Sequence, residues 1–375
     1  MSRFLISCGG TGGHLSPGIS LAEGLAARGH EAVLLVSQKK VDARLLEKYP
    51  QLRFERLPGT GWSWHPVQAL RFVVSQAKAF LRFRQIAREA HTDGIVGFGG
   101  FTSVSAAVAG RMLGIPVALH ESNRVPGRTI RLGGRLAQRV YLPPGISIPA
   151  ISEKMTRHVG LPVRREIVRH PVAAARAAFG LDPQRRTLVI LGGSQGASAL
   201  NDWVRTNCEA LANEGVQVYC VTGLGKGREG AVELKTKNGE TVRVVYAGFC
   251  DRMAELMSAA DLVVSRAGAG TLAELIRCEA PAILVPYPQA ADDHQRANAA
   301  FFEQQGAGIA LAQPQLGELR AQVLALIGDE ARLRTFRENL QRLDRANSLE
   351  FMLHDLEEIV AARGGPRDRP QPAAA

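Results

Sequence analysis

Two glycine-rich loops each stand between a short apolar segment and a helical one. Residues 9–14 read Gly-Gly-Thr-Gly-Gly-His, and residues 192–197 read Gly-Gly-Ser-Gln-Gly-Ala. Glycines let a backbone approach a ligand closely, and the N-terminus of the following helix attracts negative charge. We therefore predict that both loops bind an anion such as a phosphate group. In the second loop, the Ser194 hydroxyl and the Gln195 amide can donate hydrogen bonds to its oxygens.

A third segment of the same kind covers residues 265–274, Ser-Arg-Ala-Gly-Ala-Gly-Thr-Leu-Ala-Glu. Its glycines follow an apolar run and precede a helical stretch, so its first amides also point at an anion. Glu274 lies one turn into that helix, where a carboxylate is unwelcome to a phosphate. It is better suited to accept hydrogen bonds from a pair of hydroxyls, such as those of a ribose. A solvated helical carboxylate is the alternative interpretation.

His14 is the candidate general base from residue type and position. It falls in the first turn of a predicted helix, where the helix dipole disfavours the protonated imidazole and lowers its pKa. A neutral histidine in such a place can accept a proton from an attacking hydroxyl. The alternative is a histidine that only packs against or caps the helix.

Residues 286–298 form a loop rich in hydrogen-bonding side chains directly after a predicted strand. Ligands of parallel sheets bind outside the carboxyl ends of the strands, which favours a binding role. Asp292, Asp293 and His294 have metal-binding side chains, but adjacent residues rarely converge on one ion. We expect neither a bound metal nor a cofactor. The first glycine loop does not have the G-x-G-x-x-G spacing, which argues against an NADP oxidoreductase.

The elements that hold these loops alternate between strand and helix in both halves of the chain. Helical periodicity covers residues 15–28, 68–88 and 198–213, and the apolar runs predict these strands: 3–7, 32–37, 94–97, 116–120, 187–191, 216–222, 242–246, 262–265 and 282–285. This pattern predicts an α/β protein with two Rossmann-like, doubly wound parallel-sheet domains. We place them at residues 1–163 and 164–362, with a hinge at 160–162 and a disordered tail at 363–375.

Positive charge is concentrated in the first domain. The 375 residues have a net charge of +11, yet residues 1–163 hold 21 Lys and Arg against nine Asp and Glu, and the remainder holds 25 against 26. No acidic residue stands between Arg56 and Arg88, where basic and aromatic residues mix. The helix at 68–88 suits an anionic membrane surface, although packing on its own sheet is the alternative. No apolar run approaches the roughly 18 residues of a membrane span.

Taken together, the motifs resemble those of the MurG family of bacterial glycosyltransferases, in glycosyltransferase family 28. The resemblance covers residues 3 to about 360 in order and rests on residues 9–14, 97–101, 120–123, 192–197, 266–274 and 294–295. It implies a GT-B fold with two domains facing a cleft. The implied reaction moves N-acetylglucosamine (GlcNAc) from UDP-GlcNAc to the C4 hydroxyl of the MurNAc sugar of lipid I, with inversion, and gives lipid II for peptidoglycan. Leu161 stands where the family commonly has Asn.

The resemblance also implies a set of contacts with the sugar nucleotide. Cys250 would use its backbone on the uracil edge, and Glu274 would take the ribose hydroxyls. His294 and Gln295 would hold sugar hydroxyls, while Ser194 and the amides of the third segment would hold the diphosphate. The implied contact residues are Thr11, Gly12, Gly13, Asn123, Arg164, Ser194, Cys250, Ala269, Gly270, Thr271, Leu272, Ala273, Glu274, His294 and Gln295.

Several alternatives remain open from the sequence. His14 is the first candidate for the base and Glu121 the second. A UDP-GlcNAc 2-epimerase would share the architecture, but its chemistry needs further carboxylates at the anomeric site, of which we find no clear set. A nucleic-acid-binding protein would leave the glycine loops and Glu274 unexplained. The implied partners are UDP-GlcNAc, lipid I and the cytoplasmic face of the bacterial plasma membrane, with no nucleic acid.

Overall fold

The chain folds into two compact units, each built on one twisted sheet. The computed structural model describes residues 1–9, 12–36, 46–58, 66–193, 196–345 and 349–364. Within these ranges, unit 1 comprises residues 1–122, 126–164 and 347 onward. Unit 2 comprises residues 165–346 together with the three residues 123–125. Each unit is described here by itself.

The sheet of unit 1 has the strand order β3-β2-β1-β4-β5-β6-β7, and every pair in it is parallel. Apolar residues fill its central strands, as expected for a parallel sheet that is covered on both faces. The strands are β1 (Arg3–Ser7), β2 (Glu31–Val36), β3 (Arg53–Arg56), β4 (Gly94–Gly97), β5 (Val117–His120), β6 (Arg139–Leu142) and β7 (Thr156–His158).

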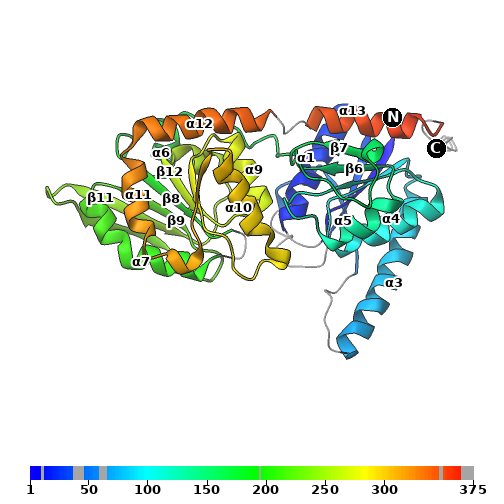
Figure 1. Ribbon diagram of the computed structural model, residues 1–375, viewed down its shortest axis with the longest axis horizontal. Helices are drawn as coiled ribbons and strands as arrows, with labels where there is room; N and C mark the ends of the chain where they lie inside the picture. The colour runs from blue at the N-terminus through cyan, green and yellow to red at the C-terminus, as the bar shows by residue number, and fades with distance from the viewer. Residues whose placement is uncertain (10–11, 37–45, 59–65, 194–195, 346–348, 365–375) are drawn as a thin grey trace. The chain divides into compact units, whose positions relative to one another are not determined.

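Helices cover both faces of that sheet (Figure 1). Those of unit 1 are α1 (Gly12–Ala27), α3 (Pro66–Glu89), α4 (Phe101–Leu113), α5 (Arg128–Gly133) and α13 (Leu349–Ala361), with short 3-10 turns at Gly134–Leu136 and Glu153–Met155. On one face, α1 and α13 pack side by side over Phe4 and Ile6. On the other, α3 and α4 pack over Leu5 and Leu35.

Unit 2 repeats the plan with the strand order β10-β11-β9-β8-β12-β13-β14. Its strands are β8 (Thr187–Leu191), β9 (Gln217–Val221), β10 (Gly230–Lys235), β11 (Thr241–Ala247), β12 (Leu262–Ser265), β13 (Ala282–Leu284) and β14 (Gly308–Ala310). Its helices are α6 (Val172–Ala178), α7 (Ser198–Asn213), α8 (Met253–Ala259), α9 (Ala269–Arg277), α10 (His294–Gln304), α11 (Leu319–Ile327) and α12 (Glu330–Asp344), with 3-10 turns at Ala291–Asp293 and Gln313–Gln315.

The predicted fold class is confirmed, and all nine predicted strands are observed with one residue or less of difference at both ends, as β1, β2, β4, β5, β8, β9, β11, β12 and β13. One part of the expectation is wrong, because the sheet of unit 2 is not entirely parallel. β10 pairs antiparallel with β11 through a tight turn. The turn contains Asn238 and Gly239, and Gly239 has a φ of 80°, a conformation that glycine adopts without strain.

The compact units also differ from the predicted domains. α13 lies within the range assigned to the second domain, yet its apolar side chains join the core of unit 1. The predicted hinge at 160–162 belongs to unit 1, where Leu161 is buried. Residues 123–125 leave unit 1 for unit 2 and the chain then returns. The predicted tail falls almost entirely on residues 365–375, outside the described residues.

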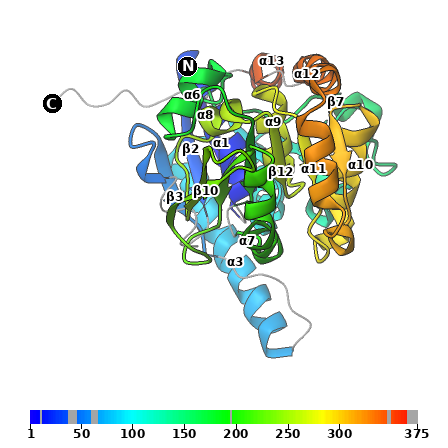
Figure 2. The same cartoon turned by 90° about the vertical axis from the view of Figure 1, so that its left-hand side faces the viewer.

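α3 confirms the packing interpretation for its last turns. Phe83 and Ile86 are buried in the core of unit 1, and Phe80 packs against it. The opposite side of the helix is exposed, including Leu81 and Lys78. The first turns of α3 extend beyond α4 in Figure 1, and in Figure 2, turned by 90°, they extend below the labelled strands β2 and β3. The side chains of residues 66–73, and Trp62 and Trp64, lie outside the described residues.

Candidate functional site

One candidate site is at the point in unit 1 where the strand order reverses. β1 lies between β2 and β4, so the chain segments that follow β1 and β4 diverge to opposite faces of the sheet. Such a switch point, at the carboxyl ends of the strands, is where open α/β sheets bind ligands. The first glycine loop follows β1, and the residues 97–101 follow β4, so the structure brings these two motifs together.

Side-chain hydroxyl groups stabilise these two loops by hydrogen bonds. Ser7 Oγ donates to Thr102 Oγ1 over 2.9 Å, and Thr102 Oγ1 donates to the Gly9 carbonyl over 3.3 Å. Ser103 Oγ donates to the Gly99 carbonyl over 2.6 Å. All three side chains are buried. Sequence reasoning did not assign these residues, because their role depends on two loops that are about 90 positions apart.

His14 lies in the first turn of α1, as predicted, and its ring lies against the backbone of the β4 loop. A Cβ placed on Gly99 would stand 3.4 Å from His14 Nε2, and one on Gly100 would stand 3.5 Å from Nδ1. Both glycines have a positive φ, 92° and 72°, so any other residue would be strained there. A Cβ on Gly100 would also stand 2.3 Å from the Gly9 carbonyl oxygen, which is a clash. The glycines thus let the two loops approach closely beside His14, which is half-buried.

Glu121, the second candidate base, directly follows β5. It is 5% exposed, and its Oε2 accepts a hydrogen bond of 2.7 Å from the Gly127 amide. The neighbouring His120 is buried beside the rings of Phe98 and Tyr141. Burial lowers the pKa of His120 to about 4, so it is neutral at physiological pH. Glu121 is thus a carboxylate with a structural partner, whereas His14 stands at the switch point itself.

Arg164 belongs to unit 1, although we predicted it to begin the second domain. It is 9% exposed, and its Nη1 donates to the Tyr49 hydroxyl over 3.3 Å. Gly12 and Gly13, two further residues of unit 1 that the family resemblance implies as contacts, are the first two residues of α1. Thr11 lies outside the described residues.

Unit 2 contains a second candidate site, again where its strand order reverses. β8 lies between β9 and β12. The second glycine loop follows β8 and leads into α7, and Arg266–Gly268 follow β12 and lead into α9. Two helix N-termini therefore meet the same edge of the sheet, which is a favourable place for a diphosphate. Ser194 lies outside the described residues.

There is open space beside the first turn of α9. A Cβ placed on Gly270 would meet no atom within 4 Å. Leu272 and Ala273 bury their side chains, and the Leu272 amide donates to the Gly268 carbonyl within the helix. Residues 269–271 are therefore more accessible at this end of the helix than residues 272–273. Glu274 is half-buried one turn further on, and its contact with a ribose stays a prediction.

Gln295 joins the loops that follow β12 and β13. Its Oε1 accepts from the Ala267 amide over 3.2 Å and from the Tyr287 amide over 2.9 Å. His294 precedes it at the start of α10, and its Nδ1 is 2.6 Å from the Ala291 carbonyl. Asp292 and Asp293 adopt φ values of 49° and 53°, in the left-handed region that non-glycine residues seldom occupy. The loop is thus sharply turned where it enters α10.

Asn298 is a residue of this site that the sequence did not single out. It is 2% exposed, and its Nδ2 donates to the Ala267 carbonyl over 3.0 Å and to Asn123 Oδ1 over 3.1 Å. Its Oδ1 accepts from the Arg124 amide over 2.9 Å. Asn298 therefore attaches residues 123–125 to unit 2 and orients Asn123. The only sequence signal was a polar residue on the apolar face of a helix.

Cys250 and Arg266 complete the described surroundings. Cys250 follows β11, and burial raises the pKa of its thiol, which keeps the side chain neutral. The buried Arg266 donates to the carbonyls of Val285 and Pro286 and to Gln313 Oε1. Through these hydrogen bonds, the Arg266 guanidinium stabilises the loop that follows β13.

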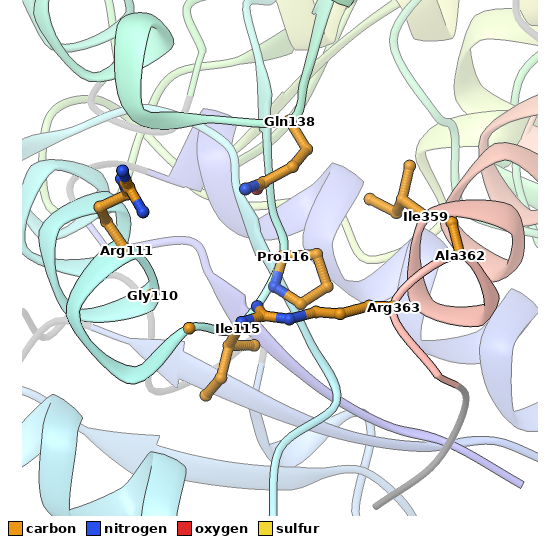
Figure 3. Close-up of a pocket in the computed structure, with 9 residues that line it drawn as sticks. Gly110, Arg111, Ile115, Pro116, Gln138, Ile359, Ala362 and Arg363 are labelled. Carbon is orange, nitrogen blue, oxygen red and sulfur yellow. The ribbon is translucent and has the colours of Figure 1, made fainter.

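Neither a metal cluster nor a membrane span occurs within the parts of the chain that the structure describes. A cavity of about 300 Å³ opens in unit 1 between Arg111, Gln138 and Arg363 (Figure 3). It adjoins the end of α4 and the residues that precede β5, and so lies at the amino ends of the strands. It is therefore separate from the glycine loops.

Comparison with known proteins agrees with this geometry. Residues 4–142 match the glycosyltransferase family 28 N-terminal domain, and residues 187–349 match its C-terminal domain. A protein of Opitutus terrae is 61% identical over 97% of both chains, and one of Clavibacter michiganensis is 36% identical over 97% of this chain and 98% of its own. Both are called UDP-N-acetylglucosamine–N-acetylmuramyl-(pentapeptide) pyrophosphoryl-undecaprenol N-acetylglucosamine transferase.

Solved structures support the fold. The crystal structure of Acinetobacter baumannii MurG matches with a TM-score of 0.70 and 24% identity, over 96% of this chain and all of that one. The calicheamicin glycosyltransferase CalG4 matches with a TM-score of 0.67 and 14% identity, over 97% and 100%. Two Rossmann-like units form the GT-B fold, and the two family 28 domains make the chain a glycosyltransferase of that class.

Within that class, the chain belongs to the MurG family of glycosyltransferase family 28. The transferase names of both relatives do not favour the alternative of a UDP-GlcNAc 2-epimerase.

Proposed function

We propose that this chain transfers GlcNAc from UDP-GlcNAc to the C4 hydroxyl of MurNAc in lipid I and so makes lipid II. The observation that carries the proposal is the pair of helix N-termini, of α7 and α9, at the switch point of unit 2. Such a pair favours a nucleotide diphosphate, and Glu274 lies one turn beyond it for the ribose. Unit 2 is then the donor unit and unit 1 the acceptor unit.

The reaction is a displacement at the anomeric carbon. The acceptor oxygen attacks this carbon as the bond to the phosphate oxygen breaks, and UDP leaves with the electron pair. Helix N-termini and backbone amides stabilise the charge that develops on the leaving group. The acceptor hydroxyl loses its proton to a base, for which His14 is our first candidate. Attack from the side opposite UDP inverts the configuration.

A single assay tests the proposed function. The purified protein is incubated with UDP-GlcNAc, with and without a soluble lipid I analogue, and the released UDP is measured. We expect release that depends on the acceptor, together with a disaccharide product detected by mass spectrometry. UDP release accompanied by ManNAc and independent of acceptor would instead indicate the epimerase reaction.

We further propose that unit 1 binds the anionic cytoplasmic face of the plasma membrane peripherally, where lipid I is embedded. α3 supports this, because its outward side exposes Leu81 by 60% and Val74 by 46% next to the exposed Lys78 and Arg88. Apolar and basic side chains that share one side of a helix suit the boundary between headgroups and acyl chains.

Neutralising Lys78 and Arg88 together tests the membrane proposal. Because each basic residue near an anionic surface contributes about 1 kcal/mol, the double change to Gln weakens binding to phosphatidylglycerol vesicles by about thirtyfold. The measurement is vesicle co-sedimentation at increasing salt. The matched control is Lys235→Gln with Lys237→Gln, two exposed cations of unit 2. Equal losses in both pairs, or binding that salt does not change, would refute the assignment to α3.

A further inference from the structure

Lys226 lies beside the second glycine loop, in the turn that follows β9. A Cβ placed on Gly196 would stand 3.2 Å from Lys226 Cδ, so the aliphatic stem of the lysine runs across the backbone of the loop. The same Cβ would stand 2.6 Å from the Thr222 carbonyl oxygen, and Gly196 has a φ of 70°. This close contact between turn and loop therefore requires glycine at position 196.

Asn201 fixes this turn to the start of α7. Its Nδ2 donates to the Thr222 carbonyl over 2.9 Å and to the Lys226 carbonyl over 3.3 Å. The Lys226 amide donates to the Gly223 carbonyl over 3.1 Å, which closes the turn. Since Asn201 belongs to the first turns of α7, the backbone of Lys226 is held close to the N-terminal end of that helix.

Lys226 is an exposed cation held near a helix N-terminus. Because the N-terminus of a helix carries a partial positive charge, it attracts an anion and not a cation. Among the described residues, no carboxylate forms an ion pair with Lys226. The carboxylate of Glu229, which is near in the sequence, packs against Gly248. The arrangement thus leaves an exposed ammonium group next to a loop built to receive an anion.

We propose that the Lys226 ammonium group binds the diphosphate of the sugar nucleotide. This inference rests on the proposed function and deepens it, because it adds a fixed cation to the amides that meet the diphosphate. As the bond to the anomeric carbon breaks, negative charge grows on UDP, and a cation held in place stabilises it. Arg266 does not serve this purpose, because backbone carbonyls and Gln313 engage its guanidinium.

The test compares ligands with and without phosphate. Isothermal titration measures the binding of UDP and of uridine to the wild type, Lys226→Met, Lys226→Arg and the control Lys235→Met, another exposed lysine of unit 2. Loss of a charge-assisted bond predicts that Lys226→Met weakens UDP binding by about ten- to a hundredfold. Its uridine binding should stay unchanged, which also shows that the variant is folded. Lys226→Arg should retain most of the UDP affinity, and Lys235→Met all of it.

Each other outcome overturns the inference. Unchanged UDP affinity in Lys226→Met would show that the ammonium group does not meet the diphosphate. Equal losses for UDP and uridine would show that Lys226 only supports the fold of the loop. Failure of the wild type to bind either ligand would refute the proposed function itself, and so differs from a failure confined to the variant.

Discussion

Turnover of the His14→Ala variant should fall by about 10²–10⁴-fold, while its affinity for UDP-GlcNAc stays unchanged. The reason is that His14 occupies the switch point of unit 1, against Gly99 and Gly100, whereas the donor-binding helices belong to unit 2. Removal of the imidazole deletes the proton acceptor and leaves the nucleotide contacts in place. The measurements are kcat with a soluble lipid I analogue and a separate titration with UDP-GlcNAc.

Glu121→Gln is the matched comparison for this prediction. It preserves the shape of the side chain and an oxygen for the 2.7 Å bond from the Gly127 amide. If His14 is the base, Glu121→Gln loses less turnover than His14→Ala and retains the decline in kcat at acidic pH, where the base is protonated. A larger loss in Glu121→Gln, with nearly normal turnover in His14→Ala, would exchange the two roles.

The second large effect concerns the stability of unit 1. Asp355, on α13, is 3% exposed and accepts hydrogen bonds from Arg139 Nε over 3.0 Å and from the Tyr141 hydroxyl over 2.8 Å. Arg157 Nε lies 3.4 Å away. Burial, followed by the nearby carboxylate of Asp355, raises the pKa of Tyr141 and keeps it a donor. Asp355→Ala leaves these donors without their acceptor and should lower the free energy of unfolding by about 3 kcal/mol.

Urea unfolding measures this loss, and hydrogen exchange locates it. Exchange should accelerate in β6 and β1 of unit 1 and remain unchanged in β8 of unit 2. The control is Glu350→Ala on the same helix, whose ion pair with Arg28 is largely exposed and should contribute less than about 1 kcal/mol. Similar losses in both variants would mean that Asp355 contributes no more than a surface pair.

The parts of the fold that follow from local patterns could be predicted from the sequence. β8 and β12 were located to the residue, because an apolar run that ends at glycines or a small polar residue has few alternatives. The glycine loops were placed correctly after their strands for the same reason. β11 was predicted, but its hairpin partner β10 was missed because β10 is largely exposed and lacks a strong apolar pattern.

Features that depend on distant contacts could not be predicted. Asn298 takes its role from residues 123–125, which are far away in the sequence and leave unit 1 for only three positions. α13 packs on the sheet of unit 1, but the amphipathic pattern of the helix would suit the sheet of either unit. The pattern alone therefore does not predict which unit the helix joins. The candidate base and ribose acceptor, His14 and Glu274, were instead identified from the helix ends that they occupy.

The return of α13 to unit 1 affects how the protein is made. The helix contributes Leu353 and Leu356 to the core that covers β1, the first strand of the chain. A ribosome therefore synthesises all of unit 2 before unit 1 has its full set of core residues. Since domains generally fold as units during synthesis, unit 2 has the earlier opportunity to fold. The sheet of unit 1 therefore keeps one face incompletely covered until α13, which follows unit 2 in the chain, has been synthesised.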